Sequence, residues 1–461
     1  MIVSLGGVIQ NPGTDYNIAG STITFTTNPA SGLAFFGLVL GQGIDTQSIA
    51  DGTITLAKFV SGTASNDGKY LRANNGAAPT FSSVPPNLSS VTGKIVDGAA
   101  SSLTLAGSGF LSSGLVVNFV QSSDSINVNV TVTPASDATA TVAVPSSVFS
   151  NVTSGNVVTM KVTNSDGAVS NAFNTTAVGL PTGGTITTSG SNRIHTFTSS
   201  GTFGLTFDTA VEYLVIAGGG GCGTRRHAGA GGAGGYRSNV SGQASGGGAS
   251  AEAALNLAAA NYAVTVGAGG TTAAASSGSN TNTGSTSGSD STFSSITSIG
   301  GGRGGTYDSS GLDGGSGGGG GSANNTSRFG GVATSGQGKN GGRGTTNVSS
   351  GAGGGGGGSS AVGADAGSGN GTANGGAGGA GTSSNITGSD VTRAGGGGGG
   401  GDTSGNGGSA GSGGGGAGAN SSGTPTSGTA NTGGGSGAGG SDSRGALNGG
   451  SGIVIVRYAI S

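Results

Sequence analysis

The sequence predicts an all-β protein whose second half is a glycine-rich domain bracketed by β-strands. Polar and apolar residues alternate in the first half, as in residues 21–26, and this period of two is typical of strands. No helical stripe of useful length appears there, and residues 49–59 form the best, short candidate. Two β-branched apolar runs, residues 211–217 and 452–458, enclose a stretch rich in glycine. We expect the two runs to be buried against each other.

The composition excludes several classes of protein. Of 110 glycines, 25 lie in residues 1–210 and 85 in residues 211–461, so the two halves differ in kind. A length of 461 residues suggests several domains, and a net charge of −2 gives no basic surface for nucleic acid. The single cysteine, Cys222, allows no intrachain disulfide and is expected to be buried. No apolar run is long enough to cross a membrane, and Met1 is not followed by a secretory leader, so we expect release by cell lysis.

Residues 1–45 are predicted to form a β attachment module. The alternating run 21–26 places threonines on one face and Ile23 and Phe25 on the other, and Asn-Pro turn signals lie on either side. Residues 7–16 and 20–26 resemble a β module near the start of tail-fibre proteins of podoviruses and marine phages. The resemblance implies docking on other phage tail proteins.

Residues 46–84 are predicted to be a fibre connector. Residues 49–55 and 68–79 resemble shaft connectors of such phages. The stretch is too polar and too short to bury a core of its own, and the resemblance implies that three chains associate into a homotrimer.

Residues 85–178 are predicted to fold as a β-sandwich. Short alternating runs separated by turn residues, without helices, are typical of this architecture. The runs are residues 102–105, 115–119, 128–132, 140–144 and 157–162. Residues 105–110 and 162–167 resemble hallmarks of IPT/TIG-type immunoglobulin-like domains. We interpret this Ig-like domain as a rigid spacer.

Residues 179–461 pose a choice between disorder and an unusual fold. Bare glycine blocks cannot build an apolar core, and ordering glycine carries a high entropic cost, so composition alone favours disorder. The alternative is a stack of polyglycine-II helices, with three residues per turn, bonded sideways through the main chain. Such a stack would accept alanine or serine at its edge and exclude bulky residues inside. Two further strand patterns, residues 262–270 and 291–302, favour the folded alternative.

This half resembles the glycine-rich domain of phage tail-fibre proteins and, more distantly, the tip adhesins of T-even-type phages. The resemblance rests on residues 213–221, 262–270, 291–302 and 452–458. It implies a virion tail-fibre tip protein in which stacked polyglycine helices form a scaffold and loops bind a host cell-surface receptor, either a glycan or an outer-membrane protein.

The sequence gives no support for an enzyme, a cofactor or a metal site. Gly-x-Gly-x-x-Gly recurs by chance in this composition and never sits between a strand and a helix. His195 and His227 are the two histidines, too few to favour a catalytic triad or a metal site. We expect His195 on a strand surface and His227 in a solvated loop. No paired carboxylates stand out for a depolymerase.

Receptor contacts are expected in the polar spacers, because glycine blocks offer no side chains. Aromatic rings and arginines dominate interface energies. The candidates are Tyr307, Arg328 and Phe329, followed by Arg225, Arg226, Tyr236, Arg393 and Arg444. Phe293 and Tyr262 lie in strand patterns and are expected in the core.

Two other functions stay open. The chain could be a purely structural fibre component, with the glycine-rich half as spacer or cap. It could also be an ice-binding polyglycine protein, although its threonines fall in irregular spacers rather than in a flat array.

Overall fold

The fold is all-β, as predicted. The computed structural model describes residues 1–38, 69–74, 77–272, 285–322, 328–346, 351–367, 372–440 and 447–460, with the backbone alone for 69–74 and 77–83. The helix candidate at residues 49–59 lies outside these residues. The chain forms two compact units, Met1–Val84 and Pro85–Ser461. Within the described residues no helix has the length and apolarity to span a bilayer.

The first unit consists of short antiparallel pairings. Its sheets are β2-β1-β5, β3-β4 and β6-β7. The strands are β1 (Ile2–Leu5), β2 (Val8–Gln10), β3 (Tyr16–Ala19), β4 (Thr22–Phe25), β5 (Phe35–Leu38), β6 (Lys69–Asn74) and β7 (Ala77–Ser83). The alternation predicted for β4 is confirmed, because Thr22 and Thr24 are exposed while Ile23 and Phe25 are half-buried. Tyr16 is fully buried, and its hydroxyl donates to the carbonyl of Met1 at 2.9 Å.

Residues 87–176 form the predicted β-sandwich. One sheet has the order β11-β10-β13-β14 and the other β12-β9-β8. The elements are β8 (Asn87–Thr92), β9 (Ser102–Ser108), β10 (Leu115–Gln121), η3 (Ser122–Asp124), β11 (Ile126–Val132), β12 (Thr139–Ala143), α1 (Ser146–Phe149), β13 (Val157–Asn164) and β14 (Phe173–Thr176). Every second residue of β10 is buried, and Leu105, Phe119 and Met160 meet in the core between the sheets. Strands β8 and β14 and the single turn of α1 were not predicted.

The two apolar runs that bracket the glycine-rich sequence pair with each other, as predicted. They form β18 (Thr209–Ile216) and β26 (Ile453–Ala459), which are antiparallel, with Val215 opposite Val454. They lie at the centre of the sheet β15-β16-β26-β18-β19, and β20 also pairs with β18. The other strands are β15 (Thr185–Ser189), β16 (Asn192–Phe197), β19 (Tyr236–Ser238) and β20 (Leu255–Leu257).

Both faces of this central sheet are covered. Tyr213, Val215 and Val456 belong to one apolar cluster, and Leu214 and Ile455 belong to a second. Successive residues of a strand point to opposite faces, so β18 and β26 read as continuous apolar runs because both of their faces are buried.

A second sheet, β17-β21-β22-β23, contributes to the first of these clusters. Its strands are β17 (Gly201–Leu205), β21 (Ala260–Thr265), β22 (Ser291–Phe293) and β23 (Ile296–Ser298). The strand patterns predicted at 262–270 and 291–302 are therefore confirmed in part of each range. Phe293 is fully buried, as predicted, whereas Tyr262 is only partly buried at the rim of the cluster.

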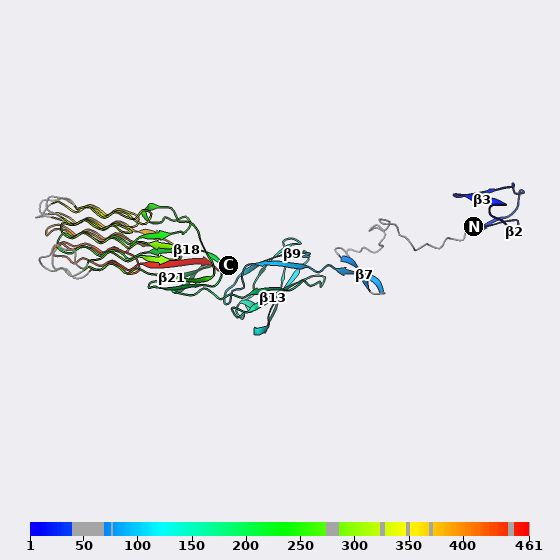
Figure 1. Cartoon of the computed structure of the whole chain (residues 1–461), viewed down its shortest axis with the longest axis horizontal. Coiled ribbons are helices and arrows are strands. Elements are labelled where there is room, and N and C mark those ends of the chain that lie inside the picture. The colour runs from blue at the N-terminus through cyan, green and yellow to red at the C-terminus, as the bar shows by residue number, and fades with distance from the viewer. Residues whose placement is uncertain are drawn as a thin grey trace. The chain divides into compact units, whose positions relative to one another are not determined.

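Most of the remaining chain consists of glycine-rich stretches between Gly218 and Gly452, which we call the glycine stack. Figure 1 shows their traces running side by side away from β18 and β26. Besides the turn η4 (Gly246–Gly248) and the hairpin of β24 (Thr382–Ser384) and β25 (Val391–Arg393), the parts of these stretches that the structure describes carry no regular helix or strand. The tip is the end of the stack remote from β18.

The stack is held together by main-chain hydrogen bonds with a three-residue period. Three consecutive backbone N–H groups donate to three different neighbouring segments. The fourth N–H group donates again to the first of these segments. The donors Gly396, Gly397, Gly398 and Gly399 bond to the carbonyls of Gly379, Gly231, Gly416 and Gly376, all at 2.8–3.0 Å. A chain with three residues per turn directs its N–H groups in this way.

The close approach of these segments requires glycine. A Cβ atom built on Gly356 would lie 1.9 Å from the carbonyl oxygen of Gly231, far inside van der Waals contact. The sequence predicted that alanine and serine would be accepted only at the edge of the stack, but they also occur in its interior. Ala230, Ala438 and Ser436 are fully buried, and the two alanines pack with Cys222 in a small apolar cluster. The interior of the stack therefore accepts small side chains where several of them meet.

Candidate functional site

The polar turns at the tip of the stack bring four of the predicted receptor-binding residues together. Arg225 and Arg226 lie in the turn that follows Gly218–Gly223, and Tyr307 lies in the turn after residues 300–305. The guanidinium carbon of each arginine lies 5.7 Å from the centre of the Tyr307 ring. Cation–π contacts of this kind attract each charge to the face of the ring and are worth about 0.5–1 kcal/mol at exposed sites.

Asp308 connects Tyr307 to a third arginine. Both Nε and Nη2 of Arg328 donate to Oδ1 of Asp308, with Nε at 3.1 Å. The side chains of this pair remain about one-third and one-half exposed. The two groups of contacts are joined because Tyr307 and Asp308 are adjacent in the chain. We call the residues Arg225, Arg226, Tyr307, Asp308 and Arg328 the tip cluster.

Three residues of the tip turns have an uncommon backbone conformation. Arg225, His227 and Asp308 have φ angles of 74°, 57° and 63°, in the left-handed region. For a residue other than glycine this conformation costs about 1 kcal/mol or more, and it is frequent at functional sites. The turns therefore hold the side chains of the tip cluster in place at some expense in stability.

Phe329 lies on the side of the stack next to the tip cluster. Its ring is 56% exposed and is covered on one side by Arg343, whose guanidinium carbon lies 4.6 Å from the ring centre. The sequence did not single out Arg343. It stands in Gly341-Gly342-Arg343-Gly344, which repeats the local sequence around the half-buried Arg303, so local sequence could not have distinguished them.

Three predicted receptor contacts do not join this group. Tyr236 is fully buried on β19 and Arg393 is 8% exposed at the end of β25, so neither side chain can reach a receptor. Burial raises the pKa of Tyr236 to about 12 and lowers the pKa of Arg393 below its ordinary value. Arg444 lies outside the described residues.

Both histidines differ from their predicted surroundings. His195 is fully buried on β16, because its face of the central sheet is covered; it lies against Phe203 and Tyr458. His227 is buried at the tip, with Nε2 3.4 Å from the carboxylate of Asp402, rather than solvated. Burial lowers the pKa of His195. The described residues contain no group of three potential metal ligands.

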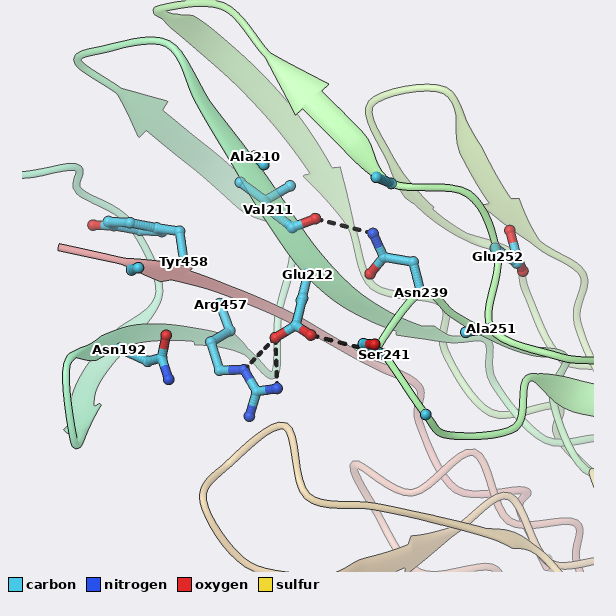
Figure 2. A pocket seen from close by; sticks show the side chains of 13 residues that line it. Asn192, Ala210, Val211, Glu212, Asn239, Ser241, Ala251, Glu252, Arg457 and Tyr458 are labelled. Carbon is cyan, nitrogen blue, oxygen red and sulfur yellow. Dashed lines mark hydrogen bonds and ion pairs between the residues drawn. The ribbon is translucent and has the colours of Figure 1, made fainter. Parts of the chain in front are cut away.

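A second candidate is a cavity of about 510 Å³ at the strand end of the stack. Figure 2 shows Glu212 and Arg457 pointing toward each other, and Nε of Arg457 donates to Glu212 at 2.7 Å. The other carboxylate, Glu252, binds Arg237 and accepts a hydrogen bond from the Tyr213 hydroxyl at 2.8 Å. Both carboxylates are therefore committed to structural partners, which makes this cavity the weaker candidate.

Comparison with known protein families identifies the region that contains both sites. A family model described as a glycine-rich domain matches residues 196–459, more than half of the 461-residue chain. The chain belongs to this glycine-rich domain family. No curated protein and no solved structure matches the chain.

The match to the glycine-rich domain begins in β16 and ends at the last residue of β26. These strands are neighbours in the central sheet, so the matched sequence is closed by its own first and last segments. The tip cluster and the Phe329–Arg343 pair both lie inside the residues that match the glycine-rich domain.

Proposed function

We propose that this protein is the tip component of a bacteriophage tail fibre and binds the host cell surface through the turns of its glycine-rich domain. The observation that supports this function is the tip cluster, in which Tyr307 and three arginines are concentrated in the turns. Aromatic and arginine side chains held in place are the usual anchors of recognition surfaces.

We infer that the segments of the glycine stack are polyglycine-II helices that act as a rigid support. The three-residue period of the hydrogen bonds supports this inference. A binding site is more effective when its side chains are carried by a rigid scaffold, because less entropy is lost on binding. The stack would then hold the turns at a fixed distance from the rest of the fibre.

The first unit is suited to attachment within the virion. Val8, Ile9 and Phe36 are more than 60% exposed on the small sheet β2-β1-β5. Exposed apolar groups of this kind favour contact with another protein. We propose that they dock on another tail protein or on equivalent chains of a homotrimer.

Adsorption of the phage that encodes this chain tests the proposed function. The purified protein should bind the host strain and block infection. Replacing Arg225, Arg226 and Tyr307 together by alanine should weaken cell binding by about 30-fold or more, because the loss of even one anchor residue of this type costs about 2 kcal/mol. The variant should retain the unfolding temperature of the parent protein, because these residues lie at turns.

The alternative, a purely structural fibre component, gives the opposite outcome. In that case the folded protein would not bind the host, or the triple variant would bind and block infection as well as the parent. Either result would favour a spacer or cap over an adhesin.

A further inference from the structure

The exposed large apolar side chains of the glycine stack all lie on one side of it. Beyond Ile186, those described by the structure are Leu312, Phe329, Val332 and Val362, which are 42%, 56%, 57% and 62% exposed. Soluble proteins seldom gather exposed apolar groups without a function. This gathering is notable in a region built mainly of glycine.

Main-chain hydrogen bonds place the segments that carry these residues next to one another. The N–H of Gly311 donates to Phe329 at 3.0 Å, and the N–H of Gly344 donates to Arg328 at 3.0 Å. The N–H of Gly363 donates to Asn340 at 3.0 Å. Residues 309–313, 328–334, 339–345 and 361–367 are therefore four consecutive segments of one layer. We call its exposed side the flank face. Its apolar members are Leu312, Phe329, Val332 and Val362, and its polar members are Asp313, Asn340, Arg343 and Asp365.

Polar side chains of the same layer accept hydrogen bonds from three of its backbone N–H groups. The N–H of Val332 donates to Asp313 at 2.6 Å, that of Ala333 to Asn340 at 2.8 Å, and that of Arg343 to Asp365 at 2.7 Å. Each of these bonds uses Oδ1 of the acceptor. Among the described residues, the second oxygen of each carboxylate and the amide nitrogen of Asn340 have no hydrogen-bond partner, so they are available to a ligand from solvent.

Arg343 adds hydrogen-bond donors to this face. Its guanidinium lies over the Phe329 ring and forms no ion pair with any carboxylate that the structure describes. The flank face thus alternates apolar surface with acceptors from Asp313 and Asp365 and donors from Arg343 and Asn340.

We propose that the flank face binds a neutral saccharide chain of the host surface. A pyranose ring has an apolar face, which packs on an aromatic or aliphatic side chain, and an edge of hydroxyls, which need both donors and acceptors. The face offers both in alternation. Among the charged residues of these segments, Asp313 and Asp365 balance Lys339 and Arg343, and Arg328 is paired with Asp308. The layer therefore offers no net positive charge to an acidic saccharide.

This inference rests on the proposed function only for the source of the saccharide, and its test needs no host. The intact protein is titrated by calorimetry with neutral tetrasaccharides (glucose, galactose, mannose and rhamnose series) and with the tetragalacturonate. At least one neutral probe should bind, and the affinity should change little with salt, because no net charge is neutralised. The tetragalacturonate should bind more weakly.

Phe329→Leu should weaken binding of the neutral probe about tenfold, because the aromatic contact is lost. Phe35→Leu is the matched control, since it removes a ring of similar exposure (54%) from the other unit and should leave the affinity unchanged. Thermal unfolding verifies that both variants fold.

The inference is overturned if no neutral probe binds the folded protein, if the acidic probe binds best, or if both leucine variants behave alike. Concentration-dependent self-association that Phe329→Leu abolishes would instead assign the face to a second copy of the chain. Attachment to host cells without saccharide binding would reject this inference and leave the proposed function intact. Saccharide binding without cell attachment would do the reverse.

Discussion

The backbone N–H of Gly397 donates to the carbonyl oxygen of Gly231 at 3.0 Å, although the two glycines belong to segments far apart in the sequence. The carbonyl of Gly397 in turn accepts the N–H of Gly356 at 2.9 Å. Gly397 is thus bonded to two neighbouring segments at once, and the glycines beside it bond sideways in the same manner. The stability of the stack therefore depends on main-chain contacts that any side chain of ordinary size would block.

Gly356→Ala should destabilise the protein by about 3 kcal/mol or more, because overpacking of this severity exceeds the usual cost of an inserted methyl group. The added Cβ would meet the Gly231 carbonyl oxygen at 1.9 Å. The control is Gly367→Ala, whose Cβ meets nothing closer than 3.8 Å and which should change stability by less than about 1 kcal/mol. Chemical denaturation measures both, and equal effects would contradict the packing described.

Phe293→Ala should cost about 3–5 kcal/mol, because Phe293 is fully buried against Phe203 and Tyr262. Phe329→Ala should change stability by less than about 0.5 kcal/mol, because that ring is 56% exposed. The same denaturation experiment separates the two. A large loss of stability for Phe329→Ala would mean that the flank face is a structural element rather than a binding surface.

Stability should fall at alkaline pH through the buried tyrosines. Burial raises the pKa of Tyr236 from 10.0 to about 12, and burial also raises the pKa values of Tyr213 and Tyr458. The unfolded chain therefore releases these protons first, and unfolding becomes more favourable as the pH rises above 10. Tyr236 alone should contribute a loss of about 2–3 kcal/mol between pH 10 and 12. Tyr236→Phe should reduce this loss, and an unchanged pH dependence would contradict the burial of Tyr236.

Acid should also destabilise the protein, through His195. Burial lowers the pKa of this imidazole below its ordinary value of 6.5, so the unfolded state binds the proton more readily. The contribution of the neutral His195 to the free energy of unfolding is therefore fully present above about pH 6.5, and it is lost as the pH falls toward the pKa of the folded state. Histidine NMR should show a neutral ring below pH 6.5, with one ring nitrogen bonded to the Gly183 carbonyl at 2.7 Å. A ring that titrates at the ordinary value would contradict this environment.

The pattern of polar and apolar residues predicted the strands well. A strand with one buried face alternates polar and apolar residues, and a strand with two buried faces is apolar throughout. The alternation of β10 and the apolar runs of β18 and β26 are of this kind. His195 shows the limit of such reasoning. A histidine in an alternating strand is expected at the surface, but Phe203 of the following strand and Tyr458 at the end of the chain cover this one. The strand pattern alone does not show that a second sheet packs on this face.

The site was predicted in part. The sequence singled out four residues in the polar spacers between glycine blocks that meet at the tip, namely Tyr307, Arg225, Arg226 and Arg328. Tyr236 and Arg393 belong to equally polar stretches, yet they are buried near the strand end. The order in which glycine segments stack decides which spacers reach the surface, and glycine carries no side chain from which that order could be deduced.

Hydrogen–deuterium exchange of the intact protein tests the central claim most directly, because it reports whether the glycine amides are bonded. The amides of residues 353–358 and 396–401, all of which have carbonyl partners at 2.8–3.0 Å, should exchange at least about a thousandfold more slowly than unstructured glycine. Exchange of these amides at the rate of an unfolded peptide would contradict a laterally bonded stack.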